Sequence, residues 1–266
     1  MNNTKIEWAD MTWNPVTGCY HGCGYCYARR IAERFRARDP EALSEVDLAK
    51  NTGRTDSPVL FLREPYVKEG KIEPYPYGFI PTFHMYRLNE PVKEKEPKNV
   101  FVCSMSDLFG DWVPDWWIAG VLEACRRAPW HNYLFLSKNP RRYAQLLNEG
   151  YINESDSNFW LGSTVTGLAE NPGFWHVSMH TFWSCEPLLA PWPPLTCPQI
   201  MPGLPEWVIL GAETGNRRGK VIPEKEWVED IVRRCKARGV SVLMKDSLAP
   251  IMGEDLMLRE FPEALL

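Results

Sequence analysis

The sequence predicts an α/β fold built on parallel strands. Apolar and β-branched runs alternate with helical segments along most of the chain, which is typical of βα units. Polar residues follow the ends of these runs, where active sites lie in parallel α/β folds. Because 266 residues are enough for one sizeable α/β domain, we expect residues 1–266 to form a single domain.

The first third of the chain is expected to hold one helix and a long excursion. Residues 5–18 read as a short entry segment with a turn at Asn14-Pro15. Apolar residues at helical spacing predict a helix over 27–38. Residues 39–81 are rich in proline, glycine and charge, so we expect a loop-rich insertion there, with a short extended piece at 58–62.

The rest of the chain carries the alternation. Apolar or β-branched runs predict strands at 82–88, 99–104, 132–137, 159–166, 180–185, 207–211 and 241–245. Helical patterns between some of them predict helices at 114–127, 140–149 and 223–238. This order favours a parallel sheet.

Polar groups follow six of these runs. They are SMSD at 104–107, SKN at 137–139, STVT at 163–166, CEP at 185–187, GAETG at 211–215 and KDS at 245–247. Each alone would read as a helix cap or loop, but six in series predict a lined pocket. Glu186 and Glu213 are candidate catalytic residues, because a buried carboxylate needs a partner or a role. A salt bridge from these glutamates to Lys138 or Lys245 is the alternative.

Composition excludes some classes of protein. A net charge of −4 and a pI near 5.8 argue against a protein that coats nucleic acid nonspecifically. Local basic groups remain, and they read either as solvated surfaces or as contacts to nucleic acid: Arg29, Arg30, Arg34, Arg36, Arg38, Arg217, Arg218 and Lys220. Because neither an apolar signal region nor a membrane-length apolar run is found, we expect a cytoplasmic protein that makes no membrane contact.

Three cysteines lie close together in the stretch GCYHGCGYCYAR, residues 18–29. Cys19, Cys23 and Cys26 have the spacing CxxxCxxC, and Gly22 and Gly24 let the backbone take the positive φ angles of a tight loop. Three converging thiolates leave one coordination position open, which suits an iron–sulfur cluster with an exchangeable iron.

The cysteine stretch resembles the cluster motif of the radical S-adenosylmethionine (SAM) superfamily, with Tyr25 before the third cysteine and YAR after it. It is most similar to the branch that includes spore photoproduct lyase and to a phage and mobile-element branch often encoded beside a three-Cys-motif partner protein. The resemblance implies a 4Fe-4S cluster held by Cys19, Cys23 and Cys26. SAM would bind the fourth iron and be cleaved to a 5′-deoxyadenosyl radical that abstracts a substrate hydrogen.

The resemblance also implies a fold and a set of contacts. The fold would be a partial (β/α)6 TIM-like barrel with the cluster loop after the first core strand. A plain GGE triplet, which binds the SAM amino group in many relatives, does not follow an early strand of this chain. The implied contacts to SAM are Ser104, Ser106 and Asp107 at its amino end, Ser137 and Lys138 near its carboxylate or the substrate, Thr164 and Thr166 at the ribose, and Tyr25 at the adenine. The segment FLSKNP, which resembles a strand end of the related branch, makes Lys138 the third candidate catalytic residue.

Partners follow from the same resemblance. The implied electron donor is a flavodoxin or ferredoxin, and the implied substrate is a nucleic-acid base or nucleotide in a phage-type modification or repair route. A three-Cys-motif protein is a further implied partner.

Two other interpretations of the cysteine stretch stay open. One is a zinc-stabilised nucleic-acid-binding module with a fourth ligand such as His21. The other is an iron–sulfur protein that transfers electrons or senses redox state without SAM chemistry. The remaining cysteines are scattered among apolar runs and are expected to be core residues: Cys103, Cys125, Cys185, Cys197 and Cys235.

Overall fold

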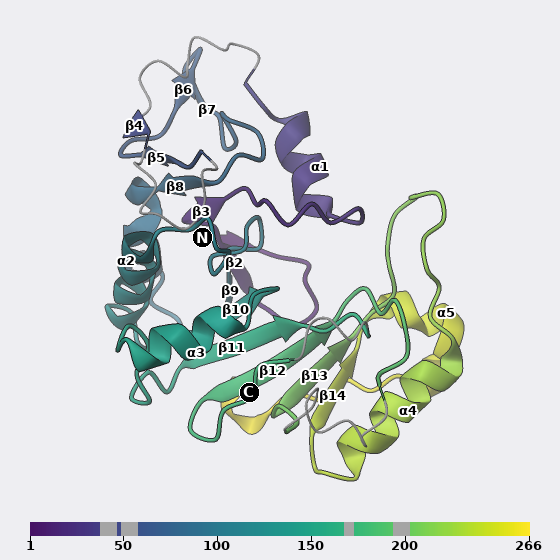
Figure 1. Ribbon diagram of the computed structural model, residues 1–266. Coiled ribbons are helices and arrows are strands. Elements are labelled where there is room, and N and C mark those ends of the chain that lie inside the picture. The colour runs from purple at the N-terminus through teal and green to yellow at the C-terminus, as the bar shows by residue number, and fades with distance from the viewer. Residues whose placement is uncertain (38–46, 49–57, 168–172, 194–202) are drawn as a thin grey trace. The chain divides into compact units, whose positions relative to one another are not determined.

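The structure is a computed structural model that describes residues 1–37, 47–48, 58–167, 173–193 and 203–266 (Figure 1). The chain divides into two compact units. The first comprises Met1–Phe135 and Gln145–Asn153, and the second comprises Leu136–Ala144 and Glu154–Leu266. The fold is mixed α/β with a mostly parallel sheet of eight strands, as the alternating pattern predicts. In the described residues this sheet does not close into a barrel.

The first unit contains the strands that lead to the cysteine stretch. The short β1 (Asn2–Asn3) pairs antiparallel with β2 (Met11–Trp13), and β2 pairs in parallel with β9 (Asn99–Val102). The next strand, β10 (Asn132–Ser137), is parallel to β9. Helix α2 (Asp115–Arg126) connects β9 to β10 and buries apolar residues at helical spacing, as an amphipathic helix must.

A second, smaller sheet in this unit has the order β3-β8-β5-β4. Its strands are β3 (Val16–Thr17), β8 (Thr82–His84), β5 (Leu60–Leu62) and β4 (Asp47–Leu48), while β6 (Val67–Lys68) and β7 (Lys71–Ile72) form a separate hairpin. The extended piece predicted at 58–62 is confirmed by β5. The predicted insertion at 39–81 lies partly outside the described residues.

One predicted strand is wrong in both length and place. The run 82–88 is expected in the parallel sheet, but β8 covers only Thr82–His84 and lies between β3 and β5 in the smaller sheet. Residues Met85–Asn89 form a 3₁₀ helix, η2, followed by η3 at Pro91–Lys93. The Trp13 indole N–H donates to the Arg87 carbonyl at 3.0 Å and so helps to hold η2 beside β2.

The second unit holds four neighbouring parallel strands. They are β11 (Phe159–Thr164), β12 (His180–Cys185), β13 (Trp207–Leu210) and β14 (Ser241–Met244). Their residues are buried almost without interruption, which is expected of parallel strands covered on both faces. The predicted strands and helices in this half are confirmed to within two residues at each end.

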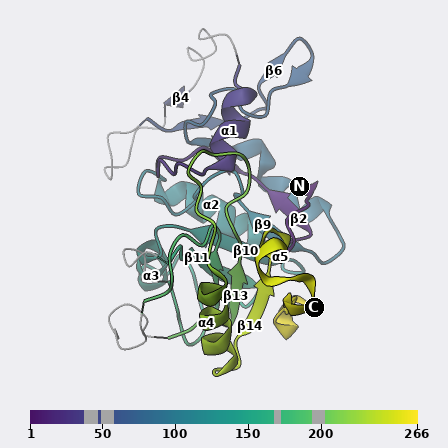
Figure 2. The ribbon, with the colours of Figure 1, turned by 90° about the vertical axis from the view of Figure 1, so that its right-hand side faces the viewer.

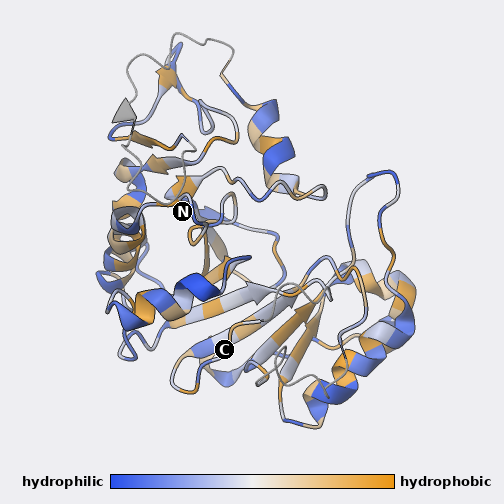
Figure 3. Ribbon diagram, viewed as in Figure 1, coloured by the Kyte–Doolittle hydropathy of each residue, from blue (hydrophilic) through white to orange (hydrophobic). Residues whose placement is uncertain are grey.

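Helices cover these strands unevenly. Helix α4 (Lys225–Lys236) packs along β14 (Figure 2) and alternates hydrophobic and hydrophilic bands (Figure 3). Helix α3 (Arg141–Asn148) follows β10, and α5 (Ala249–Met252) follows the 3₁₀ helix η4 (Asp246–Leu248). Within the described residues, no helix lies between β11 and β12 or between β12 and β13.

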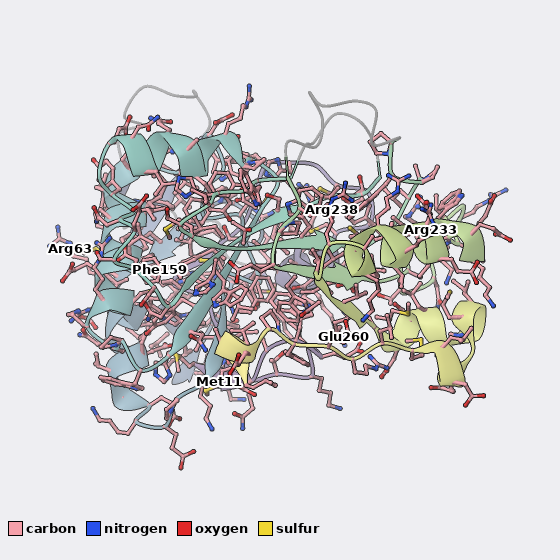
Figure 4. The ribbon with its side chains drawn as sticks, turned by 90° about the horizontal axis from the view of Figure 1, so that it is seen from below. Met11, Arg63, Phe159, Arg233, Arg238 and Glu260 are labelled. Carbon is pink, nitrogen blue, oxygen red and sulfur yellow. The ribbon has the colours of Figure 1, made fainter. Side chains whose placement is uncertain are left out.

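The C-terminal segment protects the outer edge of β14. The Met244 N–H donates to the Leu258 carbonyl at 2.8 Å, and the Glu260 N–H donates to the Val242 carbonyl at 3.0 Å. The Glu260 carboxylate, labelled in Figure 4, also accepts the Val242 N–H at 2.9 Å. Because these N–H and C=O groups of β14 already have partners, they are not free to pair with a strand of another chain. The short 3₁₀ helices η5 (Glu254–Leu256) and η6 (Glu263–Leu265) flank this segment.

None of the helices in the described ranges has both the length and the apolar character that are needed to cross a membrane.

The smaller sheet of the first unit contains a fully buried histidine. His84 Nε2 lies 2.9 Å from Thr17 Oγ1, and His84 Nδ1 lies 3.3 Å from the Tyr86 hydroxyl. Burial, reinforced by the charge of Arg87, holds the pKa of His84 well below its ordinary value. The fold therefore accommodates the neutral imidazole.

This burial predicts acid sensitivity. Below the ordinary histidine pKa, this side chain is protonated in the unfolded chain but stays neutral in the folded chain. The free energy of unfolding is therefore highest at neutral pH and falls as the pH decreases. One such group costs about 1.4 kcal/mol per pH unit. We expect the free energy of unfolding, measured in urea at pH 7 and at pH 5.5, to fall more for the native chain than for His84→Gln. Equal falls in both proteins would contradict the prediction.

Candidate functional site

The cysteine loop, residues 18–26, connects β3 to α1 (Tyr27–Arg34). It begins at Gly18, whose φ is +84° and where a Cβ would lie 2.4 Å from the Ile80 carbonyl oxygen. Only glycine fits this position without a backbone shift. The Gly18 N–H donates to the Met105 carbonyl at 2.9 Å, and the Cys19 N–H donates to the Phe79 carbonyl at 3.2 Å. These contacts fix the start of the loop.

The end of the loop is fixed by α1, which stops at Arg34 and is therefore shorter than the helix predicted over 27–38. Cys26 is the N-cap, and its Sγ accepts the Arg29 N–H at 3.3 Å. A second sulfur, Cys19 Sγ, accepts the His21 N–H at 3.5 Å. All three cysteines of the loop are partly exposed thiols outside any disulfide. Two of their sulfurs already accept backbone N–H groups, and that of Cys26 does so at the helix N-terminus, where a negative charge is favoured.

The middle of the loop is the least constrained part. Gly22 has a φ of +70°, and a Cβ added at Gly22 or Gly24 would meet no atom within 4 Å. Among the described residues, no group of three or more His, Cys, Asp or Glu side chains is arranged to hold a metal ion. The donor chemistry of the loop nevertheless fits an iron–sulfur cluster, since three thiols lie within eight residues and the glycines leave space for rearrangement.

A buried carboxylate holds the centre of the loop. Asp107 Oδ2 lies 2.7 Å from His21 Nε2, and Asp107 Oδ1 accepts the Phe109 N–H at 3.0 Å. The His21 ring also packs edge-on against Trp112, with 4.9 Å between the ring centroids. The side chains of His21 and Asp107 are 22% and 7% exposed. This His21–Asp107 contact ties the cysteine loop to the segment after β9.

Two predicted SAM contacts lie in the same segment. The Ser106 hydroxyl donates to the Gly18 carbonyl at 2.8 Å, and the Ser104 hydroxyl donates to Asn14 Oδ1 at 3.1 Å. Asn14 Oδ1 also accepts the Met105 N–H at 2.9 Å. Both hydroxyls therefore join loops of the protein to one another. Tyr25, the predicted adenine contact, is partly exposed within the cysteine loop itself.

A strained residue starts this segment. Cys103 has a φ of +59°, a conformation that costs a non-glycine residue about 1–2 kcal/mol. Burial raises the pKa of its thiol to about 12, so this cysteine is an inert thiol.

The other cysteines outside the loop are also core residues. Cys125, Cys185 and Cys235 are buried, and burial raises the pKa of Cys235 to about 12 and raises that of Cys185 as well. The prediction of core cysteines is confirmed for these three and for Cys103, while Cys197 lies outside the described residues.

The second unit carries polar groups at its strand ends. Lys138 Nζ lies 3.4 Å from the Thr164 hydroxyl, so the structure brings two predicted residues together. The Ser137 hydroxyl is buried and accepts the Asn139 N–H at 2.9 Å. The Thr166 carbonyl accepts the N–H groups of Leu189 and Ala190. The Ser137 side chain therefore serves the local backbone, whereas the Thr166 bonds involve only its main-chain carbonyl.

Both candidate catalytic glutamates are ion-paired. Glu186 Oε1 lies 2.5 Å from Lys245 Nζ, and the two side chains are 26% and 15% exposed. Gly211, which follows β13, leaves the room that Glu186 needs, because a Cβ there would lie 3.1 Å from Glu186 Cγ. For Glu186 the structure therefore contains the salt bridge that the sequence offered as the alternative, with Lys245 as its partner.

Glu213 has a different cation as its partner. Its side chain is 3% exposed and forms a two-point ion pair with Arg217, at 2.5 Å to Nε and 2.6 Å to Nη2. The Arg217 guanidinium holds the pKa of Glu213 below its ordinary value. Neither of the two lysines suggested by the sequence takes this role.

The pairing of the residues around the cysteine loop had no signal in the sequence. His21 and Asp107 are 86 positions apart, and Asn14 is predicted only as part of a turn. The parallel pairing of β2 with β9 brings them together, because it places the segments after both strands at the same end of the sheet.

Comparison with known proteins identifies a family. The model of a family described as "Protein of unknown function (DUF5131)" matches residues 3–249, which is most of the chain. Comparisons with curated proteins and with solved structures gave no significant match.

The His21–Asp107 contact predicts how the thiols react. In the reduced, metal-free protein, Asp107→Ala should release the centre of the loop and raise the iodoacetamide alkylation rates of Cys19 and Cys23 roughly tenfold, the equivalent of one hydrogen bond to a charged group. Peptide mass spectrometry measures each rate. Asp111→Ala, which removes an exposed carboxylate from the same segment, is the matched control. Unchanged rates at both cysteines in Asp107→Ala would show that the contact does not hold the loop.

The Glu213–Arg217 pair predicts a stability effect. Arg217→Met leaves a buried carboxylate without its cation and should lower the urea midpoint of unfolding at pH 7 by a few tenths of a molar. Because the pKa of Glu213 is lowered in the fold, this loss should shrink as the pH falls and the carboxylate becomes protonated. The double variant Glu213→Gln/Arg217→Met should recover part of the stability. A double variant less stable than Arg217→Met would argue against a buried charge as the cause.

Proposed function

We propose that this chain, which belongs to the DUF5131 family, is a radical SAM enzyme. The observation that carries the proposal is the cysteine loop. Its three partly exposed thiols lie between a glycine-dependent start at Gly18 and a helix cap at Cys26. Such a loop offers three sulfur donors and an open side, as an iron–sulfur cluster with an exchangeable iron requires.

Cys19, Cys23 and Cys26 would hold the 4Fe-4S cluster. When bound, it would supply the electron that cleaves SAM to a 5′-deoxyadenosyl radical able to abstract hydrogen from a substrate. The contact between His21 and Asp107 at 2.7 Å involves Nε2 and does not oppose the zinc alternative, because zinc-binding histidines usually pair their second ring nitrogen with a carboxylate. The experiment below separates the two.

Other residues of the first unit would support the cluster and SAM. Gly18 and Ser106 join the cysteine loop to the segment after β9, and Asp107 fixes its centre. These contacts support a place for residues 104–107, together with Tyr25, beside SAM. Their role would be to hold the loop and shape the adjoining surface, since the Ser104 and Ser106 hydroxyls already have protein acceptors.

The strand ends of the second unit would bind the substrate. We take its parallel strands as part of a partial (β/α)6 barrel, in which active sites lie at the carboxyl ends of the strands. The ends of β11, β12 and β13 precede Thr166, Glu186 and Glu213. Lys138, with Thr164, and Glu186, with Lys245, are suited to bind a polar substrate and to hold or move a proton.

The proposed substrate is a nucleic-acid base or nucleotide, and the proposed location is the cytoplasm, where thiols remain reduced. Exposed arginines on both units are compatible with phosphate contacts. A three-Cys-motif protein is retained as a proposed partner.

The test is SAM cleavage by protein purified without oxygen and reconstituted with iron and sulfide. With dithionite as reductant, the native chain should release 5′-deoxyadenosine, and Cys23→Ala should release only the background amount. Cys125→Ala, which removes a buried cysteine outside the loop, is the matched control and should retain activity. Release by Cys23→Ala at the native rate would refute the proposal.

Two other outcomes would select the alternatives. Colourless protein that contains zinc and leaves SAM intact would favour the nucleic-acid-binding module. A cluster that is reduced by dithionite but never cleaves SAM would favour an electron-transfer or sensor protein.

A further inference from the structure

Three neighbouring strands of the second unit bring a carboxylate and an ammonium group together at their carboxyl ends. The register of β12, β13 and β14, which lie side by side in Figure 1, places Glu186, Gly211 and Lys245 level with one another, directly after the last paired residues. The N–H groups of Gly211 and Lys245 still donate to the neighbouring strand, at 3.1 and 2.8 Å. Because Gly211 has no side chain, Glu186 and Lys245 meet across it, with 2.5 Å between Oε1 and Nζ.

The Glu186–Lys245 pair keeps part of its hydrogen-bonding capacity. In the part of the chain that the structure describes, the Glu186 carboxylate accepts only from Lys245 and only at Oε1, and the Lys245 ammonium group donates only to Glu186. An ionised carboxylate accepts at both oxygens, and an ammonium group has three N–H donors. The pair therefore offers an acceptor, Oε2, beside further N–H donors.

The second candidate glutamate has no comparable capacity. Arg217 donates to both carboxylate oxygens of Glu213, from Nε and from Nη2, and the Glu213 side chain is only 3% exposed. The side chains of Glu186 and Lys245 are 26% and 15% exposed. Of the two glutamates, Glu186 is therefore the one able to bind a polar ligand while it keeps its cation.

A structural role explains the Glu186–Lys245 pair poorly. A largely buried ion pair contributes little stability compared with apolar side chains of the same size, because both charges lose their water. Hydrogen-bonding groups in such a partly desolvated place discriminate strongly between ligands, since a mismatched ligand leaves them without partners. The pair is thus better suited to selecting a ligand than to stabilising the fold.

We propose that the Glu186–Lys245 pair reads the Watson–Crick edge of guanine. This inference rests on the proposed function, in which the substrate is a base or nucleotide, and it names the base. Guanine presents two adjacent donors, N1–H and the 2-amino group, beside the O6 acceptor. The Glu186 carboxylate accepts from both donors, and the Lys245 ammonium group donates to O6.

The other bases match this pair less completely. Adenine and cytosine each present a single amino donor on this edge, so one carboxylate oxygen would stay without a partner. Uracil presents one N–H between two carbonyl oxygens, and one of these oxygens would face the carboxylate. A buried charge left without its hydrogen bond lowers affinity, so the pair favours guanine over all three.

The test exchanges the carboxylate for an amide. Glu186→Gln replaces one acceptor by an amino donor, which matches xanthine, because xanthine has a carbonyl oxygen in place of the 2-amino group of guanine. Glu206→Gln is the matched control, since Glu206 is also ion-paired, with His180 at 2.9 Å, but precedes β13 at its amino end. Isothermal titration calorimetry measures the binding of GMP, XMP, AMP, CMP and UMP to the full chain.

We expect the native chain to bind GMP roughly tenfold more tightly than the other four nucleotides, the discrimination of one hydrogen bond to a charged group. Glu186→Gln should reverse the order of GMP and XMP, and Glu206→Gln should keep the native order. An unchanged preference for GMP in Glu186→Gln, or loss of both GMP and XMP binding, would overturn the inference.

A second variant separates base selection from damage to the fold. Lys245→Gln keeps the Glu186 carboxylate and a donor, so it should bind GMP more weakly but still prefer it to XMP. A preference for XMP in Lys245→Gln would contradict the assigned roles. The gain of XMP binding in Glu186→Gln cannot come from misfolding, which only removes binding.

The base can reach the site as a free nucleotide or within a strand. A single-stranded decamer with one guanine, compared with the same decamer carrying adenine at that position, distinguishes the two sources. A guanine preference in either form supports the inference, and the form that shows it identifies the source. Absence of the preference in both forms would overturn it.

Failure of the proposed function is a separate result. If the native chain yields no 5′-deoxyadenosine with dithionite, the radical SAM proposal fails, and the binding measurements still decide whether guanine is read. If 5′-deoxyadenosine is released but guanine is not preferred, only the inference about the base fails.

Discussion

The parallel pairing of β2 with β9 is the constraint on which the candidate site depends. Trp13 pairs with Val102, so the chain leaves both strands at the same end of the sheet. The next residues of one strand then meet those of the other. Five hydrogen bonds then join the two segments. Asn14 accepts from Ser104 and Met105, and Gly18 donates to Met105 and accepts from Ser106. The His21 ring contacts the Asp107 carboxylate. A sheet register therefore fixes a loop that lies several residues beyond it.

This arrangement fixes the two ends of the cysteine loop more firmly than its middle. Gly18 is enclosed by the Ile80 carbonyl, and Cys26 is part of a helix cap, whereas Gly22 and Gly24 have open space around them. The hydrogen bonds that hold the thiols are each worth about 1 kcal/mol, while a structural metal ion contributes about 10 kcal/mol or more. If the proposed metal centre is bound, ligation would outweigh these local contacts and draw the thiols together.

Local and periodic interactions are what the sequence predicts well. Strands β10 and β12 have the predicted bounds because continuous apolar runs mark parallel strands buried on both faces. At 82–88 the prediction is wrong, since pairing with β3 and β5 and the Trp13–Arg87 hydrogen bond decide the conformation. Strand order alone leaves two partners for Glu186, because Lys138 follows β10 and Lys245 follows β14, each two strands from β12. The pairing with Lys245 is settled by the three-dimensional structure, which no local pattern encodes.

Arginines stabilise local structure in both units. In the second unit, three of them form ion pairs: Arg217 with Glu213, Arg234 with Asp230 and Arg259 with Asp246. In the first unit, the Arg29 guanidinium lies over the Phe79 ring, 5.2 Å from its centroid, and donates to the Cys19 carbonyl. The Arg29 N–H donates to Cys26 Sγ. One arginine therefore ties both ends of the cysteine loop to helix α1, and its loss would loosen the loop at both ends.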